Sequence, residues 1–288
     1  MRRIVVLLLV GAAALGSTAA AVQGRGGRPA VRLRVLRLVD RTRSVRFENG
    51  TSGPRVLVTY VRYPTRGRRP FPLVVFAHGF ALTPQTYARL LATWARAGYV
   101  VAAPAFPGER RGAPGGPSQA DLVNEPADLS FVVSRLTART SPLRGLVDPT
   151  RIALAGHSDG AEAALAASYD PRYRDPRVDA ALVFSGAAFP GFGRAPRGSP
   201  PLLAVQGTAD PINRPAVTAA YYRLMRRPKF LLWLMGASHL PPYAAVDRWS
   251  GVVDRATTAF LGHYLRGEPL APLLAAGVPG VARIGADP

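Results

Sequence analysis

The sequence predicts an α/β fold, with a mostly parallel central sheet and helices on both of its faces. Short uninterrupted apolar runs recur along the chain, and such runs are typical of parallel strands buried on both faces. Segments with a helical pattern lie between these runs, so that strand and helix alternate in βαβ crossovers. The 29 glycines and 28 prolines supply the many turns that this alternation needs.

The first two strands differ from the others. Residues 31–39 and 55–63 alternate apolar and polar side chains, which is the period of half-buried antiparallel strands. We therefore expect an antiparallel pair at the N-terminal edge of the sheet.

The later runs are apolar throughout and predict central strands. They cover residues 73–77, 99–103, 152–155, 181–184, 202–205 and 230–234. Helices are expected between them, at residues 84–97, 126–139, 159–168, 215–226 and 246–265. One catalytic domain is predicted from about residue 28 to residue 267, and residues 268–288 read as a Gly/Pro/Ala-rich C-terminal tail.

The N-terminus has the pattern of a secretory signal. Two arginines follow Met1, residues 4–16 are apolar, and the small residues that follow fit cleavage after Ala21. A membrane anchor is the alternative, but thirteen residues of helix span only about 20 Å of a ~30 Å hydrocarbon core. The sequence thus predicts a signal peptide at residues 1–21 and a secreted, extracytoplasmic protein.

The composition narrows the classes of partner and cofactor. Lys and Arg number 37 against 17 Asp and Glu, a formal net charge of +20. The arginines form no stripe with interleaved aromatic residues, so nucleic acid is not expected as a partner, while weak association with anionic surfaces stays open. The absence of cysteine excludes disulfides, thiolate metal sites and a cysteine nucleophile. No metal or cofactor is expected, and the oligomeric state is not indicated.

The strongest motif is Gly156-His157-Ser158-Asp159-Gly160. It follows an apolar run and precedes an alanine-rich helical segment, which is the context of a serine nucleophile on a tight turn from strand to helix. The turn would present the Ser158 hydroxyl at a helix N-terminus, where the partial positive charge favours a developing oxyanion. The alternative is an ordinary glycine-rich turn with a serine helix cap.

A serine nucleophile needs a base, and four histidines are candidates. His239 follows the last apolar run, so it should lie at the same sheet edge as Ser158. His157 adjoins the nucleophile and would point away from its Oγ, His78 ends an earlier strand, and His263 lies in a helical stretch. We therefore predict His239 as the base.

The acid that orients the base is predicted to be Asp210. It follows the run at 202–205 and lies between Ser158 and His239 in chain order. Other aspartates follow the nucleophile helix in what reads as a surface loop, and a calcium site there has only weak support: Asp170, Asp175 and Asp179.

Two backbone N–H groups are expected to form the oxyanion hole. One belongs to Asp159, directly after the nucleophile, and the other to Phe80, in the loop after His78-Gly79. A carboxylate facing an oxyanion would oppose its charge, so the Asp159 side chain is expected to turn outward to water or to an arginine.

At these residues the chain resembles the α/β-hydrolase superfamily. The resemblance is to its serine-dependent branch of dienelactone-hydrolase-like proteins, platelet-activating-factor-acetylhydrolase-like proteins and bacterial polyester hydrolases. It rests on His78-Gly79-Phe80, Gly98-Tyr99-Val100-Val101 leading to Pro104, the serine motif, Gly207-Thr208-Ala209-Asp210 and Gly236-Ala237-Ser238-His239. The resemblance implies an exported carboxylic ester hydrolase without a cofactor. Ser158 departs from the cysteine nucleophile of true dienelactone hydrolases, and the disulfide common in secreted polyester hydrolases cannot form here.

The substrate pocket is expected to be open. Residues 186–201, where such folds often carry a lid, are too few to build a large one. Candidate walls for bound substrate are Phe106, Phe189, Phe192, Leu240 and Tyr243.

The sequence thus predicts a secreted serine hydrolase that cleaves carboxylic esters through an acyl-enzyme intermediate. Its expected substrates are short to medium acyl esters or bulky ones, either small molecules or polymers. An amidase or peptidase on the same triad is one alternative. A non-catalytic surface-binding protein that kept the fold is another.

Overall fold

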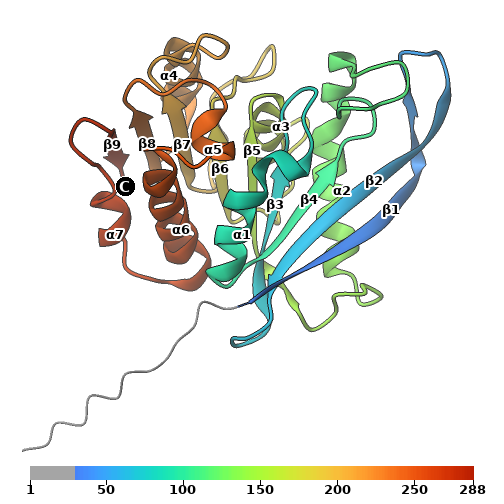
Figure 1. The fold of residues 1–288 in the computed structure, drawn as a ribbon, viewed down its shortest axis with the longest axis horizontal. Helices are drawn as coiled ribbons and strands as arrows, with labels where there is room; N and C mark the ends of the chain where they lie inside the picture. The colour runs from blue at the N-terminus through green and yellow to red at the C-terminus, as the bar shows by residue number, and fades with distance from the viewer. Residues whose placement is uncertain (1–29) are drawn as a thin grey trace, which may run out of the picture.

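The computed structural model describes residues 30–288, through which one nine-stranded sheet runs in the order β1-β2-β4-β3-β5-β6-β7-β8-β9 (Figure 1). The predicted signal peptide lies outside the described residues. The strands are β1 (Val31–Arg46), β2 (Ser52–Pro64), β3 (Phe71–Ala77), β4 (Val100–Ala105), β5 (Val147–His157), β6 (Ala180–Phe184), β7 (Leu202–Gly207), β8 (Lys229–Leu234) and β9 (Ala282–Asp287).

Helices cover both faces of this sheet. Figure 1 shows α1 and α6 in front of it and α2, α3 and α4 behind it. The helical elements are η1 (Pro84–Tyr87), α1 (Ala88–Arg96), η2 (Gln119–Asn124), α2 (Glu125–Thr137), α3 (Asp159–Tyr169), α4 (Pro215–Leu224), α5 (Pro241–Ala244), α6 (Ser250–Arg266) and α7 (Ala271–Leu274). The predicted α/β architecture is confirmed.

The N-terminal pair is antiparallel, as the alternating pattern predicts. In β1, Val31 pairs with Pro64 at one end and Val39 pairs with Val56 further along. The chain continues the pair beyond the predicted limit, with a register shift between Asp40 and Ser44. β2 then joins the rest of the sheet through an antiparallel pairing with β4.

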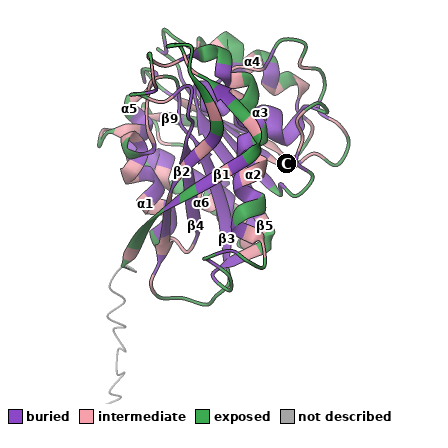
Figure 2. Ribbon diagram, turned by 90° about the vertical axis from the view of Figure 1, so that its right-hand side faces the viewer, coloured by how far each residue is buried: buried purple, intermediate pink, exposed green. Residues whose placement is uncertain are grey.

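The six central strands are parallel to one another and are buried, as the purple interior strands of Figure 2 show. Their carboxyl ends therefore meet at one edge of the sheet, where loops can bring side chains from distant parts of the sequence together. The apolar face of α1 is also buried, and Trp94 Nε1 on it donates a hydrogen bond to Thr257 Oγ1 of α6 at 2.9 Å.

The C-terminal segment differs from the sequence prediction, which separated residues 268–288 from the domain. These residues form α7 and β9, and β9 pairs antiparallel with β8 as the last strand of the sheet. Only two of its six residues, Ala282 and Ile284, pack against the apolar core, so the sequence carried no strand pattern. β9 forms because its backbone pairs with the N–H and C=O groups at the outer edge of β8.

The connection between β6 and β7 carries no lid domain. Residues 185–201 contain turns but neither helix nor strand. Within residues 30–288, no helix is both long and apolar enough to cross a membrane.

Candidate active site

Ser158 occupies a strained turn between β5 and α3. Its φ of 57° and ψ of −125° lie where L-residues are rarely found, and such strain is typical of functional positions. A Cβ on Gly156 would collide with the Gly160 carbonyl oxygen, and a Cβ on Gly160 with that of Ala77. Both glycines are therefore required for strand and helix to approach so closely, which is the reason for their spacing around the serine.

Three side chains from separate loops meet at the carboxyl edge of the sheet. His239 Nε2 lies 3.0 Å from Ser158 Oγ, and His239 Nδ1 lies 2.8 Å from Asp210 Oδ2. Ser158 follows β5, Asp210 follows β7 and His239 follows β8, and all three are at least nine-tenths buried. The structure thus brings the predicted nucleophile, base and acid into one hydrogen-bonded line.

The Asp210 carboxylate is held on every side by N–H donors. Oδ1 accepts from the backbone of Ile212 at 2.9 Å and of Asn213 at 3.0 Å. Oδ2 accepts from His239 and, at 3.3 Å, from the Gln206 side chain. Because the carboxylate cannot rotate without losing these bonds, it fixes the orientation of the imidazole. The sequence did not point to Gln206, which reads as the end of an apolar run.

The predicted oxyanion donors come from two elements, and a Cβ on Gly79, next to Phe80, would lie 2.9 Å from Ser158 Cβ. Asp159 opens α3, and Phe80 follows β3 in a loop that His78 fixes. His78 Nε2 accepts from the Phe106 N–H at 3.1 Å, so its Nδ1–H donates to the Gly79 carbonyl at 3.0 Å. Burial lowers the pKa of His78 to about 4, so the ring stays neutral in this role.

The Asp159 side chain was expected to turn outward to water or to an arginine, and this expectation is wrong. It is 6% exposed, and its Oδ2 accepts a hydrogen bond from Gln119 Nε2 at 2.8 Å. The physical reason is η2, which packs on α3 and supplies an amide donor where the sequence suggested solvent.

The predicted substrate walls are only partly exposed. Phe106 and Tyr243 are completely buried, so neither can form a wall: Phe106 packs on His78, and Tyr243 stacks on Phe184. Phe189 is 8% exposed and packs edge-on against Tyr173. Of the predicted walls, Phe192 and Leu240 are partly exposed, and Phe80 beside them is 41% exposed.

The remaining histidine and aspartate candidates have other partners. His263 Nδ1 donates to the Glu268 carbonyl. Asp170 and Asp175 are paired with Arg172 and Arg177, and Asp179 accepts the backbone N–H of Ile152. Among residues 30–288 no cluster of three or more His, Asp or Glu is arranged to hold a metal ion.

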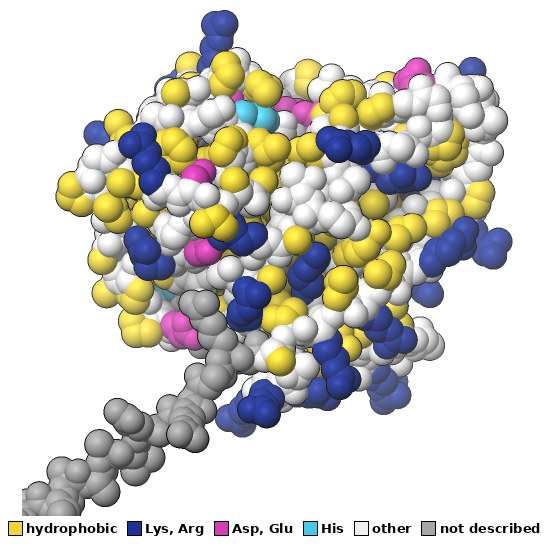
Figure 3. Space-filling model, viewed as in Figure 1, with side chains coloured by type: hydrophobic (Ala, Val, Ile, Leu, Met, Phe, Trp, Pro, Cys, Tyr) yellow, Lys and Arg dark blue, Asp and Glu magenta, His cyan; other side chains and the backbone are white. Residues whose placement is uncertain are grey.

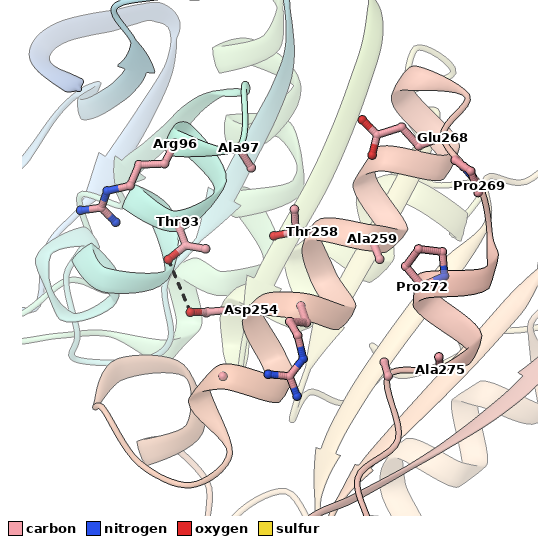
Figure 4. A pocket seen from close by; sticks show the side chains of 13 residues that line it. Thr93, Arg96, Ala97, Asp254, Thr258, Ala259, Glu268, Pro269, Pro272 and Ala275 are labelled. Atoms are coloured by element: carbon pink, nitrogen blue, oxygen red, sulfur yellow. Dashed lines mark hydrogen bonds between the residues drawn. The ribbon is translucent and has the colours of Figure 1, made fainter. Parts of the chain in front are cut away.

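Two cavities lie away from the triad. One of about 880 Å³ opens between α1, α6 and the segment before β9, where Thr93 faces Asp254 (Figure 4). Another of about 670 Å³ lies near the start of β3. Neither is lined by a triad residue, so a substrate of Ser158 does not enter through them.

Two buried acids lie near Asp159: Glu109 in the loop after β4, and Glu125 at the start of α2. Glu109 and Glu125 are completely buried, and none of their four carboxyl oxygens has a hydrogen-bond partner among the described residues. Burial raises the pKa of both groups, and nearby carboxylates raise it further, Asp159 that of Glu109 and Asp128 that of Glu125. Buried without a cationic partner, each carboxyl is more stable while it keeps its proton.

This pair makes stability depend on pH. A carboxyl whose pKa is raised by folding stabilises the protein below its unfolded pKa, and that contribution is lost as pH rises through the raised pKa. We expect the free energy of unfolding to fall less between pH 5 and pH 8 in Glu125→Gln than in wild type. The difference between the two proteins should be about 1–3 kcal/mol. Thermal unfolding at the two pH values measures the effect, with exposed Glu48→Gln as the control. The same pH dependence in Glu125→Gln and wild type would contradict it.

The fold and the site define a class of protein. A mostly parallel sheet with a serine elbow between β5 and α3 is the architecture of the α/β-hydrolase superfamily. Residues 39–209 match the chlorophyllase family, and the chain belongs to that family. It is a carboxylic ester hydrolase.

A solved structure agrees with this fold. A ferulic acid esterase from Streptomyces cinnamoneus superposes with a TM-score of 0.68 at 22% identity, over 86% of this chain and 94% of that one. Among curated proteins none matches the sequence.

Proposed function

We propose that the protein is a secreted serine esterase that acts through an acyl-enzyme. The observation that carries the proposal is the position of His239, whose ring nitrogens lie 3.0 Å from Ser158 Oγ and 2.8 Å from Asp210 Oδ2. A serine hydroxyl within reach of an oriented base is the arrangement of nucleophilic catalysis.

The chemistry follows from these contacts. Ser158 Oγ attacks the ester carbonyl carbon while its proton passes to His239 Nε2, and the N–H groups of Phe80 and Asp159 stabilise the oxyanion. The C–O bond to the alcohol breaks, and the alcohol leaves with the proton from His239. Water then gives a proton to His239 and attacks the acyl-enzyme, so that the acid is released and Ser158 regains its proton.

The preferred substrates are short to medium acyl esters or bulky ones, including polymers. The lidless β6–β7 connection, the exposed Phe80 and the partly exposed Phe192 and Leu240 support an open cleft. Each methylene buried in a pocket contributes about 0.8 kcal/mol, so an open cleft gains little from long chains.

Rates on p-nitrophenyl esters of increasing chain length, on an anilide and on ferulate esters test this proposal. kcat/KM should stop rising after a few carbons and show no jump at the solubility limit. Faster anilide cleavage would favour an amidase or peptidase, and inactivity on every substrate would favour the non-catalytic alternative.

Export is part of the proposal and rests on the sequence of residues 1–21. Expression in a bacterial host with its native N-terminus should place the protein outside the cytoplasm, with Val22 as the first residue by N-terminal sequencing. Retention in the cytoplasm with Met1 intact would contradict it.

A second property, weak binding to anionic membrane surfaces, is supported by the cavity near the start of β3. Six arginines line it: Arg66, Arg68, Arg69, Arg96, Arg151 and Arg266. Arg151 and Arg266 pair with acids, whereas Arg66, Arg68 and Arg69 are exposed and pair with no carboxylate of residues 30–288. Basic side chains also spread over the face in Figure 3, so only a local comparison is informative.

We expect replacement of Arg66, Arg68 and Arg69 by serine to weaken sedimentation with phosphatidylglycerol vesicles about 10- to 100-fold at low salt. Serine at three exposed arginines outside the cavity, Arg135, Arg139 and Arg223, is the control with the same net charge. Equal losses in both variants would assign the binding to net charge rather than to this cavity.

A further inference from the structure

A chain of hydrogen bonds behind the triad links three loops. The Gly79 N–H donates to Tyr87 Oη at 3.2 Å, and Tyr87 Oη lies 2.8 Å from His157 Nδ1. His157 Nε2 lies 2.9 Å from the carbonyl oxygen of His239. Both bridging side chains are completely buried.

The direction of every bond in this chain is fixed. A carbonyl oxygen only accepts, so His157 must carry its proton on Nε2 and donate it to His239. Nδ1 is then an acceptor and takes the Tyr87 O–H, which leaves the Tyr87 oxygen to accept from Gly79. Every donor in this chain of hydrogen bonds thus meets an acceptor.

This chain of hydrogen bonds links the ends of two strands that are not neighbours in the sheet. Gly79 follows β3 and His239 follows β8, and three strands lie between these two in the sheet. No backbone pairing can therefore fix the distance between the oxyanion loop, residues 78–80, and the base. Tyr87, which ends η1, and His157, the last residue of β5, fix that distance with two side chains.

We propose that Tyr87 and His157 are positioning residues that hold the oxyanion loop and His239 in place around Ser158. This inference rests on the proposed esterase function. His157 acts as a neutral linker rather than as a second base, because both of its ring nitrogens are already engaged. Burial, with the nearby His239, lowers the pKa of His157 to about 3, so the ring stays neutral at working pH, and its two hydrogen bonds select the tautomer.

Tyr87→Phe tests the proposal with little change in packing. The ring remains against Phe76, 4.7 Å between centroids, while Gly79 loses an acceptor and His157 a donor. We expect kcat for a p-nitrophenyl ester to fall about 10- to 100-fold, because small misplacements of catalytic groups cost about that much. KM should change by less than about twofold, since no group that binds substrate is removed.

Tyr169→Phe is the matched control. Tyr169 is also buried, and its hydroxyl donates one hydrogen bond, to the Pro201 carbonyl at 3.2 Å, away from the triad. Thermal unfolding should show comparable losses of stability in the two variants, while only Tyr87→Phe loses kcat. Unchanged kcat in a folded Tyr87→Phe, with active wild type, overturns the positioning role and leaves the esterase proposal intact.

A measurement that needs no substrate separates the two proposals. Nitrogen-15 NMR of the wild-type imidazoles should show His157 neutral with its proton on Nε2 down to pH 5. A proton on Nδ1, or a charged ring at that pH, overturns the linker even if no ester is cleaved. The rate of fluorophosphonate labelling of Ser158 should fall in Tyr87→Phe and stay unchanged in Tyr169→Phe.

Discussion

Ser158→Ala is expected to lower kcat for ester hydrolysis by about 10³ to 10⁶ and to abolish labelling by a fluorophosphonate. Only the attacking oxygen is lost, and the alanine methyl group keeps the Cβ of the strained turn. The fold should therefore persist, because the close approach of β5 and α3 depends on Gly156 and Gly160 rather than on the hydroxyl.

Ser168→Ala is the control for this variant. Ser168 is a completely buried serine of α3, the helix that follows Ser158, and its hydroxyl has no hydrogen-bond partner among the described residues. It should keep wild-type rates and wild-type labelling. Retained labelling in Ser158→Ala would move the nucleophile to another residue.

Asp210→Asn is expected to lower kcat by about 10³ to 10⁴ at an almost unchanged structure. The carboxylate accepts from four N–H groups, so the NH₂ of an asparagine must face a donor in either orientation. The orientation that keeps the two backbone bonds, from Ile212 and Asn213, places this NH₂ against His239. The imidazole then changes tautomer, presents Nε2–H to the serine, and can no longer accept its proton.

Steady-state kinetics measure this loss of kcat, with Asp175→Asn as the control variant. Asp175 is also buried and hydrogen-bonded, but its partner is Arg177. Its replacement should reduce stability without reducing kcat. Full activity in Asp210→Asn would assign the orienting acid to another position.

Stability should decline on both sides of a mildly acidic range. Below pH 6.5, His78 and His157 stay neutral in the fold while the same histidines of the unfolded chain take up protons. Stability therefore decreases as the pH is lowered toward their folded-state pKa values of about 4 and about 3. Above pH 6.5 these histidines no longer change the stability, and the deprotonation of Glu109 and Glu125 dominates.

The amino-acid sequence by itself determined the central strands, the main helices and the places of Ser158, Asp210 and His239 at strand ends. These features are local: an apolar run, a helical period, or a glycine spacing can be read without knowing what packs against it. Since parallel strands share one carboxyl edge, order along the chain was enough to bring these three residues together in the prediction.

Only the tertiary structure decided which side chains face one another across that edge. The links through Tyr87 and His157, the burial of Phe106 and Tyr243, and the unpartnered pair Glu109 and Glu125 depend on contacts between elements far apart in the sequence. β9 was missed for the same reason, because a strand with little apolar pattern is stabilised by the edge that it covers. Packing decides burial, and burial decides whether a polar group is a solvated surface residue or a partner in the site.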